Sequence, residues 1–185
     1  AGCIAGNGLG SKGTYRGLAS DCLLIGLKCL NQGGTGDIRS VLSALQWVHD
    51  NRDRYSIRVV HIPFGVYHPF PLGQDPLIMA VERLWDEGLV VVCAAGNNGP
   101  HRASIASPGT SSKVITVGSY TNHAVSTDPT DICPFSSRGP TFDGSAKPDL
   151  VAPGREVPST YHRAIGEPGG YLSFSGTSAS SSIVA

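Results

Sequence analysis

The stretch Val90-Val91-Val92-Cys93-Ala94-Ala95-Gly96-Asn97-Asn98-Gly99-Pro100 decides the fold that the rest of the chain is expected to adopt. Its first half is an unbroken apolar run, which is typical of a strand buried on both faces of a parallel sheet. Its second half is a glycine turn that presents Asn97 at the end of that strand. An amide side chain in this place can donate a hydrogen bond to an oxyanion, although Asn, Gly and Pro are also the ordinary residues of turns.

Segments of helical and strand character alternate on either side of this stretch. After Asp37 or Thr35, either of which can cap a helix, apolar residues recur at helical spacing to about residue 50. A second such segment follows Asp75, with Pro76 at its first position and a glycine at its end. The expected order is a strand over 23–30, a helix over 37–50, a strand over 58–65, a helix over 76–87, and strands over 89–94 and 113–119.

This alternation predicts an α/β fold with a mostly parallel sheet, because parallel strands need long crossover connections that are usually helices. Residues 120–175 show no strong periodicity and are expected to be rich in loops. No internal repeat or linker divides the 185 residues, so we expect one domain or most of one. The chain begins without Met and stops in mid-pattern, so we expect a truncated piece of a longer protein.

A second chemical signal lies in Ser173-Phe174-Ser175-Gly176-Thr177-Ser178-Ala179-Ser180. The residues after the glycine turn can begin a helix. Ser178 would then lie where backbone N–H groups are unpaired and the helix dipole favours negative charge, which suits a nucleophile. Serine-rich runs are also common in solvated loops and helix caps, so this stretch alone does not decide between the two interpretations.

The composition argues against several classes of function. Hydrophobic residues make up 40% of the chain, charged residues 15%, and the formal net charge is zero. A neutral chain gives no reason to expect nucleic acid or an anionic membrane as a partner. The longest apolar run, residues 89–95, is far too short to span a bilayer.

The cysteines and histidines follow no metal-ligand or disulfide pattern. Five cysteines are an odd number, and Cys22, Cys29 and Cys93 lie in apolar runs. Free thiols favour a reducing compartment, and hence a cytoplasmic rather than a secreted protein. Each histidine is expected to be a surface or hydrogen-bonded core residue rather than a catalytic base. The six histidines are His49, His61, His68, His101, His123 and His162.

The glycine-rich segment Gly6-Asn7-Gly8-Leu9-Gly10-Ser11-Lys12-Gly13 raises the question of a phosphate-binding loop. Its spacing differs from the GxxxxGK[ST] pattern, and no strand is expected before it within the chain. We therefore expect a flexible loop, and a nucleotide-binding α/β module is the weakest of the functional hypotheses.

Several blocks in a fixed order together resemble the subtilisin-like serine proteases, or subtilases. Ala-Ala-Gly-Asn at 94–97 and Gly-Thr-Ser at 176–178 match the oxyanion and nucleophile motifs of that family. Further matching blocks are residues 17–19, 105–109, 114–118, 135–140 and 147–154. The resemblance covers nearly the whole chain and is strongest to the intracellular alkaline branch of bacterial subtilases.

The resemblance implies a subtilisin-like three-layer sandwich, truncated at both ends, with helices on both faces of a mostly parallel central sheet. Residues 1–185 would be a partial catalytic domain that begins just after the catalytic histidine motif and ends in the helix carrying the nucleophile. In subtilases the triad order is Asp, His, Ser. The chain contains no Asp-Ser/Thr-Gly or His-Gly-Thr motif, so both partners of the serine would lie outside it.

The resemblance also implies roles for individual residues. Ser178 would be the nucleophile, and Asn97 would donate its side-chain amide to the oxyanion together with the Ser178 backbone N–H. Two segments would clasp an extended protein or peptide substrate, and a pocket with an apolar or aromatic preference would take the side chain before the cut. The clasping residues would be Gly34, Thr35, Gly36, Pro63, Phe64 and Gly65, and the pocket residues Ala94, Ala95, Gly96 and Ala106.

No cofactor is implied for the reaction. Some subtilases bind calcium as a structural ion in the loop that corresponds to the glycine-rich segment. Asn7 is available there, but no carboxylate lies near it in the sequence, so we assign no calcium site to this chain.

The chain departs from the family pattern after the nucleophile. Where the family has G-T-S-M-A-x-P, this chain has Ala179, Ser180 and Ser182 in place of methionine, alanine and proline, and Pro63 replaces a serine. The first hypothesis is that the parent protein is a serine endopeptidase acting through an Asp-His-Ser triad and an acyl-enzyme. The alternative is an impaired pseudoprotease that binds peptide chains. The 185 residues alone are expected to be inactive, because without the triad only about 10³–10⁴-fold catalysis over water remains.

Overall fold

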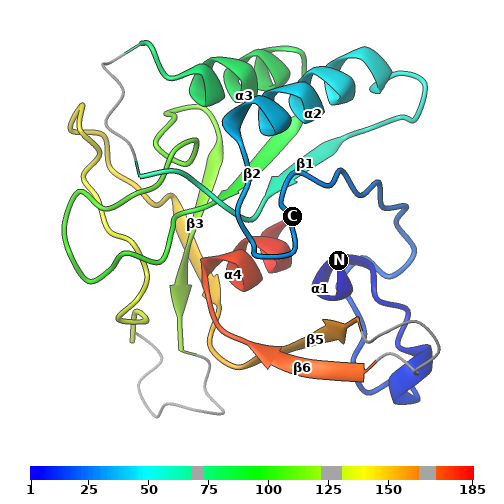
Figure 1. Cartoon of the computed structure of the whole chain (residues 1–185). Helices are drawn as coiled ribbons and strands as arrows, with labels where there is room; N and C mark the ends of the chain where they lie inside the picture. The colour runs from blue at the N-terminus through cyan, green and yellow to red at the C-terminus, as the bar shows by residue number, and fades with distance from the viewer. Residues whose placement is uncertain (68–72, 122–130, 163–169) are drawn as a thin grey trace.

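Four parallel strands form the centre of the molecule in the computed structural model, which describes residues 1–67, 73–121, 131–162 and 170–185 (Figure 1). The strands are β1 (Val59–Ile62), β2 (Val90–Ala94), β3 (Ile115–Tyr120) and β4 (Leu150–Pro153). They lie in this order across the sheet, and each pairs in parallel with the next. The predicted α/β class with a parallel sheet is confirmed.

Strand β2 is covered on both faces, as its unbroken apolar sequence predicts. Val91 and Cys93 belong to one buried cluster, whereas Val92 belongs to a second cluster on the opposite face. Successive side chains of a strand point to opposite faces, so these residues divide the sheet into two sides. The predicted strand over 58–65 is shorter in the structure, because the ladder of β1 ends before Pro63, which has no N–H to donate.

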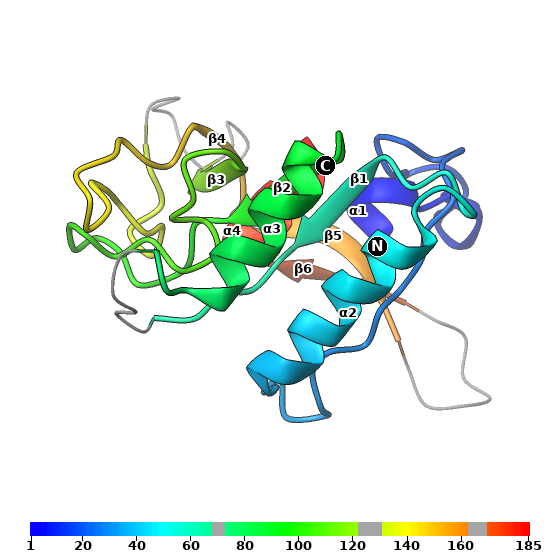
Figure 2. The same ribbon diagram turned by 90° about the horizontal axis from the view of Figure 1, so that it is seen from above.

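Helices α2 (Ile38–Asn51) and α3 (Pro76–Asp86) cover one side of the sheet (Figure 2). Each begins at a predicted aspartate cap: Asp37 accepts a hydrogen bond from Arg39 N, and Asp75 accepts from Leu77 N and Ile78 N. The residues at helical spacing form the buried stripe that joins each helix to the sheet. They are Val41, Leu45, Val48, Leu77, Val81 and Leu84.

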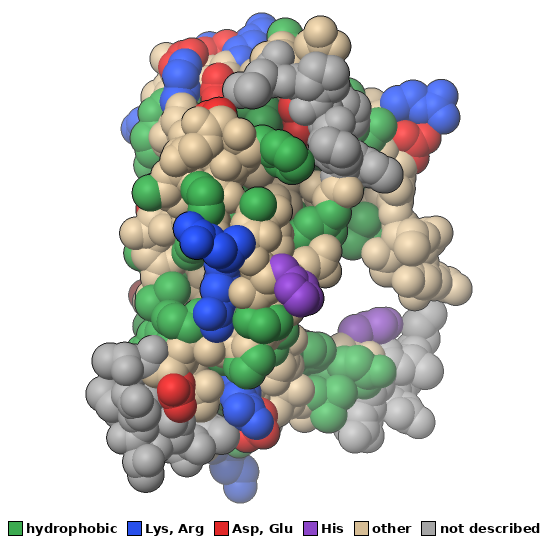
Figure 3. All heavy atoms as spheres, turned by 90° about the vertical axis from the view of Figure 1, so that its left-hand side faces the viewer, with side chains coloured by type: hydrophobic (Ala, Val, Ile, Leu, Met, Phe, Trp, Pro, Cys, Tyr) green, Lys and Arg blue, Asp and Glu red, His purple; other side chains and the backbone are tan. Residues whose placement is uncertain are grey.

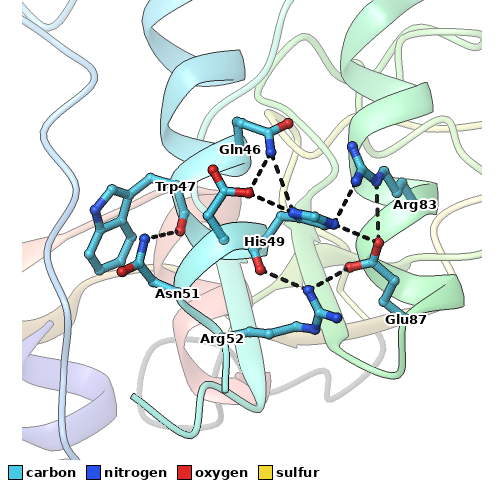
Figure 4. Close-up of polar contacts among 8 residues, drawn as sticks. Gln46, Trp47, His49, Asn51, Arg52, Arg83 and Glu87 are labelled. Carbon is cyan, nitrogen blue, oxygen red and sulfur yellow. Dashed lines mark hydrogen bonds and ion pairs between the residues drawn. The ribbon is translucent and has the colours of Figure 1, made fainter. Parts of the chain in front are cut away.

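Polar side chains fix α2 against α3 at the outer surface (Figure 4). Glu87 Oε1 lies 2.9 Å from His49 Nε2 and 3.2 Å from Arg83 Nε. The second oxygen of Glu87 lies 3.3 Å from Arg52 Nη1. This cluster of charged groups therefore has a structural role in joining the two helices, and His49 is a hydrogen-bonded residue as expected.

The other side of the sheet is covered by α4 (Thr177–Val184), which contacts all four strands. Helix α1 (Gly2–Ala5) packs against α4 and against β5 (Val157–Tyr161). Strand β5 pairs antiparallel with β6 (Gly170–Phe174), which leads directly into α4 (Figure 1). Helices therefore lie on both faces of the sheet, and the three-layer arrangement is confirmed.

One strand prediction along the chain is wrong. Residues 23–30 form no strand, and residues 21–28 are exposed. A parallel strand needs a ladder partner as well as apolar side chains, and in the described part of the chain β1 pairs only with β2. The described part of residues 120–175 is rich in loops as predicted, although β4, β5 and β6 lie within it. In the glycine-rich segment, a short 3-10 helix, η1 (Leu9–Ser11), stands where a flexible loop was expected.

Other properties of the chain agree with its composition. All five cysteines are free. No helix in the described ranges is long and apolar enough to cross a membrane. On the face shown in Figure 3, basic and acidic side chains are both present and neither forms a continuous area.

Candidate functional site

Ser178 lies in the first turn of α4, at the edge where β1 ends. The helix begins immediately after Gly176, whose φ is 150°, and Gly176 N donates to Gly154 O over 2.8 Å. The side chain of Ser178 is half-buried, and its hydroxyl donates a hydrogen bond to the carbonyl of Pro63. The glycine turn therefore delivers Ser178 to the end of the sheet, as the sequence predicts.

Asn97 lies in the turn after β2 and contacts the start of α4. Its Oδ1 accepts hydrogen bonds from Thr177 N over 2.9 Å and from Thr177 Oγ1 over 3.1 Å. Because both partners donate, the oxygen of the Asn97 amide must face the helix and its NH₂ group must face away from Thr177. The side chain of Asn97 thus takes up one of the orphan N–H groups at the helix start.

Two hydrogen-bond donors at this site have no partner among the described residues. One is Nδ2 of Asn97, which lies 3.3 Å from the position that a Cβ on Gly176 would occupy. The other is the backbone N–H of Ser178, in the first turn of α4. Two free donors beside a serine hydroxyl are what an oxyanion formed at that serine would need.

Thr177 and Tyr67, which sequence reasoning did not single out, brace the turn that holds Asn97. Gly96 N donates to Thr177 Oγ1 over 3.1 Å, and Asn97 N donates to the Tyr67 hydroxyl over 2.7 Å. Gly96 has φ +106°, and a Cβ there would lie 2.1 Å from the Tyr67 hydroxyl. The position of Thr177 within the nucleophile motif was a usable signal, whereas nothing in the sequence pointed to Tyr67.

The residues predicted to flank the site lie close together at the ends of β1 and β2. A Cβ on Gly65 would come within 2.6 Å of Ala106 Cβ, and Ala106 N donates to Ala95 O over 2.9 Å. Ala94, Ala95 and Ala106 are buried, with 3%, 0% and 1% of their surfaces exposed. Pro63, Phe64 and Gly65 are half-buried.

The structure does not bring Gly34, Thr35 and Gly36 to Ser178. These residues are exposed, and the hydrogen bonds of Thr35 run to Asn31 within the same turn. Figure 2 shows this turn at the start of α2, apart from α4. Of the two predicted clasping segments, only residues 63–65 therefore lie beside the serine.

Within the described residues, no histidine hydrogen-bonds to Ser178. His61 lies in β1 with its Nε2 2.9 Å from Ser181 Oγ, one turn after the predicted nucleophile. Burial first, and then the nearby α-amino group of Ala1, lower the pKa of His61 to about 4. His101 and His162 are exposed, and His68 and His123 lie outside the described residues.

Metal and thiol chemistry find no support in the described part of the chain. No three His, Cys, Asp or Glu side chains there gather as metal ligands would. Cys93 is buried beneath the helices, and this burial raises the pKa of its thiol to about 12. A thiol held in its protonated form is a poor nucleophile.

Comparisons with known proteins identify the family and the fold of the chain. The sequence profile of the Subtilase family (Peptidase_S8) matches residues 1–185. Serine protease AprX of Bacillus subtilis (strain 168) is 42% identical over 164 residues, which cover 85% of this chain and 37% of AprX. Subtilisin DY of Bacillus licheniformis is 31% identical over 171 residues, which cover 91% of this chain and 53% of that protein.

The fold is also that of a solved member of this group. The structure of Sphericase matches with a TM-score of 0.82 and 26% sequence identity, over 99% of this chain and 58% of that chain. The chain thus spans between 37% and 58% of the length of these three relatives. With a profile match along its whole length and a shared fold, the chain belongs to the subtilase family of serine proteases.

Proposed function

We propose that this chain supplies the nucleophile and the oxyanion donors of a serine endopeptidase that acts on protein or peptide substrates. The observation that carries the proposal is the pair of unpartnered donors, Asn97 Nδ2 and Ser178 N–H, beside the Ser178 hydroxyl. Attack by Ser178 on a scissile carbonyl would place negative charge on the carbonyl oxygen, and donors fixed beforehand stabilise that charge without reorganising.

The remaining steps require groups that the described chain does not place at Ser178. A serine is a weak nucleophile unless a base accepts its proton, and the hydroxyl of Ser178 instead donates to the Pro63 carbonyl. We propose that an Asp and a His elsewhere in the full-length protein complete the triad. Covalent catalysis by a serine invokes no cofactor or metal, and we propose none for the reaction.

The test is active-site labelling of the full-length protein with a fluorophosphonate, followed by peptide hydrolysis. We expect labelling of the wild type and none of Ser178→Ala. Removing an oxyanion-hole asparagine lowers kcat by about 10²–10³-fold, a range measured in a subtilisin, and we expect the same order for Asn97→Ala. Asn98→Ala is the matched control, because among the described residues only the backbone N–H of Asn98 is hydrogen-bonded, to Ser137 Oγ. Labelling that survives Ser178→Ala contradicts the proposal.

The second candidate is a pseudoprotease that binds peptides without cutting them. It is favoured by the hydrogen bond that occupies the Ser178 hydroxyl and by the altered residues after it. It predicts that the full-length protein binds extended peptides but shows neither labelling nor turnover. Hydrolysis that is lost in Ser178→Ala excludes this candidate.

A further inference from the structure

His61 is a half-buried polar residue that the proposed reaction does not use directly. It lies in β1 on the face that α4 covers, opposite the face on which Val60 and Ile62 join the helical core. Its Nε2 lies 2.9 Å from Ser181 Oγ, and Ser181 is fully buried. The sequence predicts a surface or hydrogen-bonded core residue for each histidine, and His61 is hydrogen-bonded between β1 and α4.

The contact continues to the backbone of the predicted nucleophile. Ser181 Oγ donates to the carbonyl of Ser178 over 3.2 Å, and Ser182 Oγ donates to the same carbonyl over 2.7 Å. A carbonyl only accepts, so the contact with Ser178 uses the single hydroxyl proton of Ser181. The contact with His61 then requires a proton on Nε2 of the imidazole, whereas a proton on Nδ1 alone would make Ser181 the donor to Nε2.

Strand β1 consequently touches α4 at two points. His61 reaches Ser181, and two residues further along the chain the Pro63 carbonyl accepts from Ser178. Residues three apart on a helix lie on the same face, so both contacts act on one side of α4. Together they fix the position of α4 along β1 and its rotation about its own axis.

Polar contacts, including those of Thr177 with Asn97 and Gly96, hold the start of α4, whereas large apolar side chains contribute little near Ser178. The helix has eight residues, and an isolated helix of that length is not stable in water. Its first turns carry small side chains, and its larger apolar residues, Ile183 and Val184, come at the far end. A directional hydrogen bond close to Ser178 therefore has more influence on the position of the serine than the apolar contacts.

We propose that His61, acting through Ser181, is a positioning residue that holds Ser178 in place for attack. The inference depends on the proposed role of Ser178 as the nucleophile. His61 does not touch the substrate in this scheme, so its loss affects the chemical step rather than substrate binding. The imidazole acts as the neutral Nε2–H tautomer.

The experiment compares Ser181→Ala with Ser180→Ala in the full-length protein. Both remove one buried hydroxyl from α4, but Ser180 Oγ has no hydrogen-bond partner in the described chain. Small misplacements of reacting groups cost up to about 10²-fold in rate. We expect Ser181→Ala and His61→Leu each to lower kcat and the labelling rate about tenfold or more with KM unchanged, and Ser180→Ala to change neither.

Two further variants separate positioning from general destabilisation. The double variant His61→Leu with Ser181→Ala should be no slower than either single variant, since both break one chain of contacts. His61→Gln, whose amide can place an N–H near the position of Nε2, should recover most of the rate. Additive effects, or equal rates for Ser181→Ala and Ser180→Ala, overturn the proposal.

A direct readout distinguishes this proposal from the proposed function. If the wild type shows no labelling that depends on Ser178, the proposed protease function fails. In either case, ¹⁵N NMR of the imidazole is expected to show a proton on Nε2 of His61 whose signal shifts in Ser181→Ala and not in Ser180→Ala. A proton on Nδ1 alone would make Nε2 the acceptor of the Ser181 hydroxyl, which would take the Ser181 proton from the Ser178 carbonyl and overturn the proposal.

Discussion

At the scale of single residues, Gly96 is a point where two segments around the candidate site approach closely. Its φ of +106° disfavours any side chain, and a Cβ would lie 2.1 Å from the Tyr67 hydroxyl and 2.9 Å from Ser137 Oγ. Gly88 has a similar φ of +90° but nothing within 4 Å of such a Cβ. A substitution at Gly88 therefore adds backbone strain alone, whereas one at Gly96 adds both backbone strain and a steric clash.

We expect Gly96→Ala to destabilise the protein more than Gly88→Ala. The left-handed backbone costs about 1–2 kcal/mol for a non-glycine residue, and this part is shared by both variants. Displacement of Tyr67 is added only at position 96, and it should also reduce activity because Tyr67 holds Asn97 N. Urea unfolding of both variants measures the difference, and equal losses of stability would contradict the close approach.

His61 makes stability depend on pH. Its pKa is about 4 in the folded chain, mainly because burial disfavours the charged form, against 6.5 for an ordinary histidine. Below pH 6.5 the His61 imidazole is protonated in the unfolded chain but stays neutral in the folded chain. The stabilisation is therefore complete above pH 6.5 and is lost as the pH falls towards 4, by about 3 kcal/mol in total.

The measurement is urea unfolding of the wild type and of His61→Gln at about pH 7 and about pH 4.5. Carboxylates whose pKa values are lowered, such as Asp37, also lose stabilisation in acid, so the difference between the two proteins isolates the histidine. We expect the wild type to lose more stability than the variant between these pH values. The same loss in both would show that the His61 imidazole titrates normally.

The sequence predicts the two central residues of the candidate site but not how they are held. Ser178 and Asn97 stand in recognisable motifs, and the structure places Asn97 against Thr177, the residue before Ser178. The side-chain oxygen of Asn97 accepts hydrogen bonds from two donors of Thr177, which lies 80 residues further along the chain. Short-range patterns do not specify such a contact, and the same holds for the pairing of His61 with Ser181.

At the scale of elements, the two helices on one side of the sheet begin at aspartates in different environments. Asp75 is 6% exposed and accepts from Leu77 N over 2.9 Å and Ile78 N over 3.4 Å. The side chain of Asp37 is 46% exposed and accepts from Arg39 N alone among backbone groups of the described chain. Loss of a cap costs about 0.5–2 kcal/mol, and the cost grows when the N–H groups cannot reach water.

We expect Asp75→Ala to cost close to 2 kcal/mol and Asp37→Ala to cost about 0.5 kcal/mol. Asp75→Asn keeps an oxygen acceptor and should lose the least of the substitutions at that position. Thermal unfolding of the three variants gives the comparison. A larger loss for Asp37→Ala than for Asp75→Ala is the result that would refute burial as the deciding factor.

The predictability of each element follows from how much of its signal is local. Helices α2 and α3 carry caps and a long apolar stripe, and both were predicted within a residue or two. Strand β4 has four residues, begins with two exposed ones and ends in a proline, so its sequence carries little strand signal. It forms because β3 offers a free edge, with Val117 opposite Leu150 and Tyr120 opposite Pro153.

At the scale of the whole molecule, the two sides of the sheet differ in how their elements are held together. The side with α2 and α3 holds the larger buried cluster and the charged groups that join the two helices. The side with α4 carries the candidate site and a smaller apolar cluster. On this side, polar contacts such as that between His61 and Ser181 also hold α4 against the sheet. The sheet thus separates the larger apolar cluster from the candidate site, and the α4 side also holds the buried hydroxyl of Ser180, which has no hydrogen-bond partner in the described chain.

An exposed apolar segment lies in the N-terminal part of the chain. Leu18 is 72% exposed, and Leu23, Leu24 and Ile25 are 95%, 49% and 45% exposed. Clustered apolar surface promotes association or dye binding, and covering one leucine is worth about 1.5–3 kcal/mol. Phe142 is also 82% exposed, but it stands alone in a turn.

We expect the 185-residue chain to bind the dye ANS and to self-associate through this segment. The double variant Leu23→Ser with Ile25→Ser should lower both the dye fluorescence and the mass measured by light scattering. Phe142→Ser, which removes a single large side chain of similar exposure, should change neither by a comparable amount. A larger change in dye fluorescence and mass for Phe142→Ser than for the double variant would contradict this prediction. It would indicate that residues 23–30 are packed against another part of the chain in solution.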